Sequence, residues 1–187
     1  VRELRQRFMR ATERCRDAMQ RQRADSARQG WTEAFAASAC VRAYGLATIR
    51  QAAPDDLDAR RAVAERAVAT LVHASASARA TVERELAAVA AGTTGTDVTA
   101  HESALRMLCI RAELLTDLPT PAEDLELRRE YQMQRLVQSM GRGERVSAAD
   151  LDDLALEWLA VGPVEQSVHD ELLARFERCR DGRVRQG

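Results

Sequence analysis

Hydrophobic residues recur along the chain at the three- and four-residue spacing of amphipathic helices, and no segment alternates as a strand does. The first 28 residues carry a seam with the 3-4-3-4-3 spacing of a heptad repeat. Its members are Val1, Leu4, Phe8, Ala11, Cys15 and Ala18. We expect this first helix to end at Gly30. The whole pattern predicts an all-α protein, an elongated bundle of about eight helices.

Prolines, glycines and capping residues indicate where the other helices begin and end. A second helix carries Trp31 and stops before Pro54, and the acidic residues after Pro54 favour a third helix that starts there. An alanine-rich fourth helix is expected around residues 81–91, followed by a polar loop. Capping-box patterns predict the starts of three further helices, at Thr99, Thr120 and Ser147.

The end of the chain predicts a helical hairpin with a defined corner. The first hydrophobic face consists of Leu151, Leu154, Trp158 and Val161, and the second of Val168, Leu172, Phe176 and Cys179. Between them, Gly162 can take the left-handed conformation that closes a helix, and Pro163 cannot continue one. If the chain folds back here, the two faces meet and Trp158 anchors the core.

The corner and its flanking helices resemble a bacterial helical-repeat family. The resemblance depends on Trp158, Gly162, Pro163, Val164, Leu172, Arg175 and Phe176. Together they are similar to the repeat of the family called domain of unknown function 349. The Leu-x-x-Arg-Phe-x-Arg spacing of residues 172–178 also occurs at residues 4–10, and residues 105–140 resemble the C-terminal part of long family members. Residues 31–95 show no resemblance.

The resemblance implies three segments. Residues 1–30 are then the closing helix of a preceding repeat, residues 31–145 a central helical bundle, and residues 146–187 the C-terminal hairpin of the last repeat. The chain begins at Val1 within a helical pattern, so we expect it to be a piece of a longer protein. The family has no assigned activity, and the resemblance therefore implies none.

Composition narrows the possible chemistry. Hydrophobic residues make up 45% and charged residues 30% of the 187, which is enough for a buried core. All 28 basic residues are arginine, so the chain has no lysine for a phosphate-binding loop or a Schiff base. The four cysteines are widely spaced and suggest no disulfide framework, and no uncharged run is long enough to cross a membrane. We expect a cytoplasmic protein.

The candidate catalytic residues form no known pattern. His73, His101 and His169 fall on three different predicted helices. His101 and the following glutamate begin like a zinc-protease motif, but Leu105 stands where the second histidine is needed. His169 is expected in the solvated first turn of the last helix. The sequence therefore predicts no catalytic residue, metal or cofactor, and a protein that is not an enzyme.

Charge is distributed unevenly along the chain. Residues 1–28 hold nine arginines and four acids, whereas residues 146–174 hold seven acids and no arginine. Four of the arginines share one helix face, namely Arg7, Arg10, Arg14 and Arg21. They either pair with acids inside the fold or in a neighbouring repeat, or they bind phosphates. We favour pairing, because charge runs on helices are usually solvated faces and the net charge is −1.

The sequence thus predicts a non-catalytic helical scaffold or protein-interaction module of a larger cytoplasmic bacterial protein, with unknown partners. The alternative is a nucleic-acid- or ribosome-associated protein that binds phosphates through its first helix. A weaker third option is a regulatory part of an ATPase-like assembly. The seam of the first helix must be covered, and a homodimer through this helix is one way to cover it.

Overall fold

A computed structural model describes residues 2–142 and 150–184, and within these ranges every regular element is a helix. This confirms the all-α prediction. The elements are α1 (Arg2–Ile49), α2 (Pro54–Ala69), α3 (Ala76–Ala90), α4 (Val98–Thr116), the short 3-10 helix η1 (Ala122–Asp124), α5 (Leu125–Arg142), α6 (Leu151–Leu159) and α7 (Gln166–Val184). The described ranges hold seven α-helices, fewer than the predicted eight, because the first two predicted helices are one.

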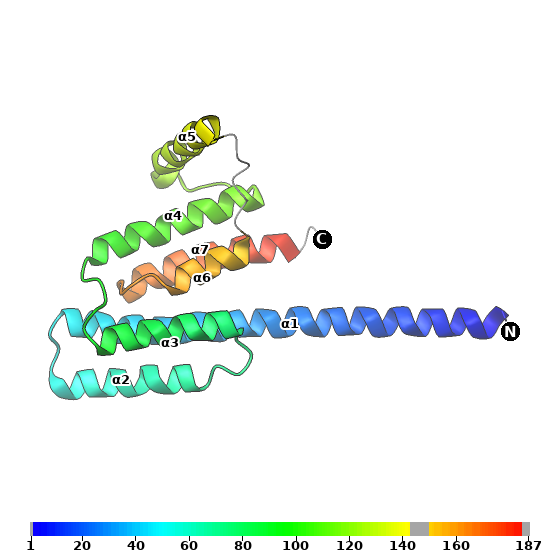
Figure 1. The fold of residues 1–187 in the computed structure, drawn as a ribbon, viewed down its shortest axis with the longest axis horizontal. Coiled ribbons are helices and arrows are strands. Elements are labelled where there is room, and N and C mark those ends of the chain that lie inside the picture. Colours follow the sequence, from blue (N-terminus) through cyan, green and yellow to red (C-terminus); the bar gives the residue numbers. More distant parts are fainter. Residues whose placement is uncertain (1, 143–149, 185–187) are drawn as a thin grey trace.

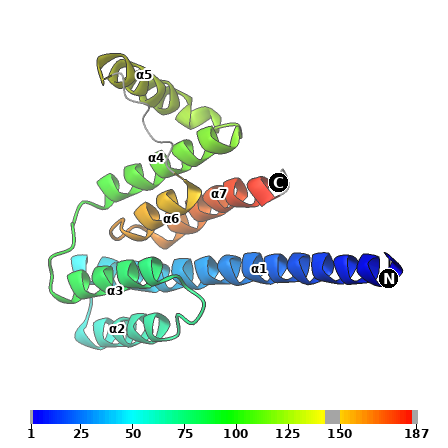
Figure 2. The same cartoon turned by 45° about the vertical axis from the view of Figure 1, so that its right-hand side comes forward.

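Helix α1 is the spine of the molecule, with 48 residues and a length of about 72 Å. Its C-terminal half is enclosed by α2 and α3 on one side and by α6 and α7 on the other (Figure 1). Helix α4 packs along α7, and α5 lies farthest from α1 (Figure 2). The N-terminal half of α1 projects alone beyond the body, and its residues 5–29 are all exposed. We call residues 5–29 the arm.

The predicted helix end at Gly30 is wrong, because α1 runs through this residue without a break. A Cβ atom at position 30 would lie 2.8 Å from the carbonyl carbon of His73 and 3.1 Å from Cα of Ala74. Both atoms belong to the backbone that joins α2 to α3. Position 30 therefore requires a glycine because this connection crosses so close to α1. The ability of glycine to adopt unusual backbone angles plays no part here.

Replacing Gly30 with alanine should lower the stability of the protein, although alanine favours a helix by about 1 kcal/mol over glycine. The new methyl group would displace backbone atoms, and such overpacking typically costs about 1–3 kcal/mol. Urea unfolding measures the change. The control is the opposite substitution, Ala27→Gly, at an exposed position of α1, which reports helix propensity alone. A Gly30→Ala variant more stable than the wild type would contradict the close approach.

Two of the predicted helix starts can be compared directly with the structure. Helix α2 begins at Pro54, as the sequence indicates. The capping box expected at Thr99 is wrong, because α4 begins one residue earlier. Its N-cap is Asp97, whose carboxylate accepts a 2.9 Å hydrogen bond from the backbone N–H of Ala100. An acid satisfies the first turn as well as threonine does.

The start of α5 also differs from the prediction. Thr120 forms no capping box; the chain enters η1 through Pro121 without a side-chain cap, and the threonine hydroxyl points into the core. The expected start of α6 at Ser147 lies outside the described residues. Helix α6 is capped by Asp150, and Asp153 accepts a hydrogen bond from the Asp150 backbone N–H in return, which completes a capping box.

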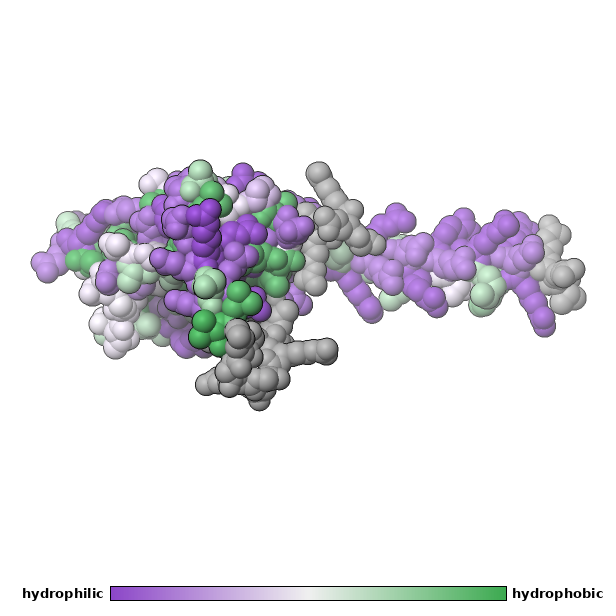
Figure 3. Space-filling view, turned by 90° about the horizontal axis from the view of Figure 1, so that it is seen from above, coloured by the Kyte–Doolittle hydropathy of each residue, from purple (hydrophilic) through white to green (hydrophobic). Residues whose placement is uncertain are grey.

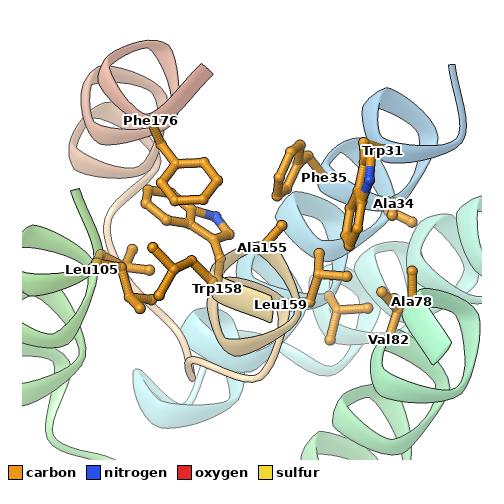
Figure 4. Close-up of a cluster of buried hydrophobic side chains, with 14 of the residues drawn as sticks. Trp31, Ala34, Phe35, Ala78, Val82, Leu105, Ala155, Trp158, Leu159 and Phe176 are labelled. Carbon is orange, nitrogen blue, oxygen red and sulfur yellow. The ribbon is translucent and has the colours of Figure 1, made fainter. Parts of the chain in front are cut away.

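One hydrophobic cluster unites the body. Its buried members come from α1, α2, α3, α4, α6 and α7, and they meet around four aromatic rings (Figure 4). These rings belong to Trp31, Phe35, Trp158 and Phe176. The cluster includes residues on both sides of the predicted boundary at residue 145, and the division into three segments stays a prediction. None of the described helices combines the length and the apolar character needed to cross a membrane.

Candidate interaction surface and the core that supports it

The aromatic residues of the predicted corner form the centre of the core. Trp158 and Phe176 are both fully buried, with ring centroids 5.0 Å apart. Phe35 of α1 meets both rings edge-on, at 6.4 Å and 6.2 Å (Figure 4). Leu172 and Val164 are buried beside them. The prediction that Trp158 is a core anchor is confirmed, and α6 and α7 are joined by a segment that contains Gly162 and Pro163.

Gly162 does not play its predicted role. Positive φ angles among the described residues occur only at Gln51, Gly92 and Asp117, so Gly162 is not left-handed. A Cβ atom at position 162 would lie 2.6 Å from Nε2 of His101. The imidazole of His101 rests directly on this glycine, and its Nδ1 lies 2.9 Å from the carbonyl oxygen of the next residue, Pro163. Close packing against α4, not backbone conformation, is what requires a glycine here.

Arg42 of α1 holds the other side of the corner. Its side chain is almost fully buried, and its guanidinium donates hydrogen bonds to the carbonyl oxygens of Trp158 and of Val161, the latter at 3.1 Å. These carbonyls belong to the C-terminal end of α6 and its exit, and that of Trp158 also accepts the backbone N–H of Val161 at 3.2 Å. Burial lowers the pKa of Arg42 to about 9, and the charge of Glu85 acts in the opposite direction. The arginine is a structural clamp on the end of α6.

His169 was expected in a solvated turn, and this prediction is wrong. Its side chain is buried, with its ring edge-on to Trp158 at 6.3 Å. Burial, followed by the positive charge of Arg42, lowers the pKa of His169 below its usual value, and hydrogen bonding to Asp170 opposes this. The imidazole is therefore neutral at pH 7 and serves as a core ring.

Arg175 is the centre of a buried ionic cluster. Its Nε and a terminal nitrogen donate to the two carboxylate oxygens of Glu113, at 2.6 Å and 2.9 Å, and the other nitrogen bonds Asp124. The hydroxyl of Thr120 donates to Glu113 at 2.5 Å and accepts from Arg128 at 2.8 Å. The cluster ties α7 to α4 and η1. Each of these groups has a partner inside the protein, so the arrangement is a structural link without a free acid, base or nucleophile.

The described residues contain no grouping of three or more His, Cys, Asp or Glu side chains suited to a metal ion. Each histidine has its own neighbours. Nδ1 of His73 lies 2.6 Å from Oε1 of Glu33, and Oε2 of the same carboxylate accepts the backbone N–H groups of Val72 and His73. These bonds to His73 are the main reason that the pKa of Glu33 is lowered. The structure thus places His73, His101 and His169 in three separate structural roles.

The arm is exposed along its whole length, and among its arginines Arg28, next to the body, pairs with Asp181 of α7. Its hydrophobic residues are open to solvent: Phe8 is 71%, Met9 58% and Met19 54% exposed. Its surface is otherwise mostly hydrophilic (Figure 3). The four predicted arginines, Arg7, Arg10, Arg14 and Arg21, are exposed. None of these four forms an ion pair with another described residue, whereas Arg28 of the same helix pairs with Asp181. Pairing of the four with a neighbouring repeat stays a prediction.

Sequence reasoning missed several residues that support the corner, above all Arg42, Glu113 and Gly45. A Cβ atom at Gly45 would lie 2.5 Å from Cγ of Pro163, so α1 and the corner approach as closely as α4 does. Arg42 carries one recognisable signal, since it stands alone as a charge within the otherwise uncharged residues 34–49. Glu113 and Gly45 carry no signal that distinguishes them from a surface acid or an ordinary helical glycine.

Comparison of this chain with protein-family models, curated proteins and solved structures finds no match. The resemblance to the family called domain of unknown function 349 therefore stays a prediction from the residues of the corner.

Proposed function

We propose that this chain is a non-catalytic helical scaffold that binds a protein partner through its projecting arm. The observation that carries the proposal is the uninterrupted exposure of residues 5–29, which include an apolar heptad seam from Phe8 to Ala18, about 15 Å of helix. A seam of this kind is typically buried against another helix. The ionic cluster around Arg175 is paired inside the protein, which favours the arm as the binding surface.

The finer features of the fold belong to the same proposal. The α6–α7 corner would be the last unit of a helical repeat in a larger cytoplasmic bacterial protein. The recurrence of the Leu-x-x-Arg-Phe-x-Arg spacing at residues 4–10 and 172–178 supports this idea. In such repeat proteins each unit is covered by its neighbour, and an uncovered terminal surface is a natural binding face.

A second candidate function is binding to RNA or DNA. It is favoured by the unpaired arginines of the arm, which include Arg7, Arg10, Arg14 and Arg21. Arginines on one helix can track a phosphate backbone, and such binding weakens steeply as salt increases. We favour a protein partner, because Phe8, Ala11, Cys15 and Ala18 have the spacing of a helix-packing seam, although an exposed phenylalanine can also stack on a nucleic-acid base.

Site-specific photocrosslinking tests the proposal. A photoreactive phenylalanine analogue replaces Phe8 in the complete chain, expressed in its own cells, and the control carries it at Val63, an exposed residue of α2. We expect a discrete protein adduct from position 8 that is absent from position 63. Adducts that nuclease removes would favour the nucleic-acid candidate. No adduct from position 8 would contradict an arm that docks partners.

A further inference from the structure

Three arginines form a continuous positive edge along the arm. Arg7, Arg14 and Arg21 recur at intervals of seven residues, and the first two directly precede the seam residues Phe8 and Cys15. In a heptad repeat this position flanks the seam and faces the flank of the partner helix. All three side chains are exposed and lack an ion pair with any described residue. We call these three residues the arginine line.

Within the body, this side of α1 is covered by α7. Arg28 continues the arginine line by one more heptad, at the point where the arm enters the body, and it pairs with Asp181 of α7 at 3.6 Å. Seven residues further, Phe35 contacts Phe176 of the same helix. The side of α1 that bears the arginine line is therefore covered, inside the body, by α7, which places Asp181 against Arg28 and Arg180 over the ring of Phe35. Beyond Arg28 this cover ends and the line continues (Figure 1).

The recurring motif leads to the same conclusion. In α7, Arg175 is bound by Glu113 of α4 and by Asp124, and the neighbouring Phe176 is buried. In the arm, the corresponding Arg7 has no carboxylate partner among the described residues, and Phe8 is 71% exposed. The same local sequence thus contacts carboxylates in α7 and contacts none in the arm.

A second copy of this chain is a poor binding partner for the arm. In a parallel pair of arms, the seam after Ala18 would bring Gln22 and Asp25 against their own copies, which sets two carboxylates together in the interface. In an antiparallel pair, the arginine line would face itself. Like charges in these positions oppose association. The homodimer expected from the seam is therefore less suitable than a partner of opposite charge.

We infer that the arm binds an acidic amphipathic helix of a partner protein. The apolar face of this helix packs on the seam of Phe8, Ala11, Cys15 and Ala18. Its carboxylates lie against Arg7, Arg14 and Arg21. This inference rests on the proposed function and names the partner's chemistry. The glutamates of such a helix recur at seven-residue intervals, in register with the arginine line.

Two matched charge reversals in the complete chain test the inference. Arg14→Glu with Arg21→Glu alters the arginine line, whereas Arg16→Glu with Arg23→Glu makes the same change in charge on the opposite side of the helix. The probe is a labelled four-heptad peptide with leucine at the seam positions and glutamate at both flanks. A second peptide carries lysine in place of glutamate. Fluorescence anisotropy measures both affinities, and circular dichroism verifies that helix content is unchanged.

We expect the chain to bind the glutamate peptide and not the lysine peptide. Reversal of Arg14 and Arg21 should weaken glutamate-peptide binding about tenfold or more and create binding to the lysine peptide. Reversal of Arg16 and Arg23 should change the affinity by less than about twofold, since these residues lie away from the seam.

The inference would be overturned by equal weakening from both reversals, by equal binding of both peptides, or by self-association of the chain that excludes the peptide. Salt-sensitive binding of an RNA or DNA oligonucleotide that both reversals weaken equally, with no peptide binding, would overturn it in favour of phosphates. If peptide binding fails while protein adducts at position 8 persist, the acidic helix is wrong and the proposed function stands. If both fail, the proposed function is wrong as well.

Discussion

Replacing Trp158 with alanine should lower the free energy of unfolding by about 3–5 kcal/mol, and Phe176→Ala should have an effect of the same size. Both side chains are fully buried and pack on each other and on Phe35, so either change leaves a cavity where α1, α6 and α7 meet. Trp158→Ala also removes the ring beside the guanidinium of Arg42. Urea unfolding followed by circular dichroism measures the loss.

The matched control is Met133→Ala in α5, where the side chain is 62% exposed and the expected change is within about 0.5 kcal/mol. Trp158→Phe should fall between the two, because it keeps an aromatic ring and removes a buried indole N–H that has no partner among the described residues. A Trp158→Ala variant that unfolds like the wild type would show that the corner contributes little to the core.

The sequence predicted the helices better than their ends. Periodicity identified the buried faces of α6 and α7, because apolar residues at every third or fourth position line up on one side of a helix. Gly30 is misleading because a glycine that ends a helix and a glycine that another segment crosses have the same local sequence. Only the approach of His73, 43 residues away, separates the two. Such tertiary contacts leave no trace in a local pattern.

The polar part of the core was harder still to predict. His169, Arg42 and Glu113 are polar residues, and each is buried because a distant helix supplies its cover. The two Leu-x-x-Arg-Phe-x-Arg segments are a direct example. Phe176 is buried and Phe8 is 71% exposed, although their local sequences match. Burial of this motif depends on which helices surround it, and the arm has none within the described chain.

The body and the arm therefore have different physical roles. The body anchors the C-terminal half of α1 through residues such as Phe35 and Arg42. A lone helix is only marginally stable in water. Because the helix is already nucleated by the buried half of α1, a partner of the arm needs to order fewer residues when it binds, which favours affinity.

Arg175→Ala should destabilise the protein by about 3–5 kcal/mol, because it leaves Glu113 and Asp124 buried without a cation. Arg50→Ala is the control, since its pair with Glu165 is largely exposed and should contribute less than about 1 kcal/mol. Urea unfolding compares the two. If the cluster acts only as a link between α7 and α4, combining Arg175→Met with Glu113→Gln should recover part of the loss, because fewer charges then remain buried. An Arg175→Ala variant no less stable than Arg50→Ala would contradict this role of the ionic cluster, and α7 would then be held by its hydrophobic face alone.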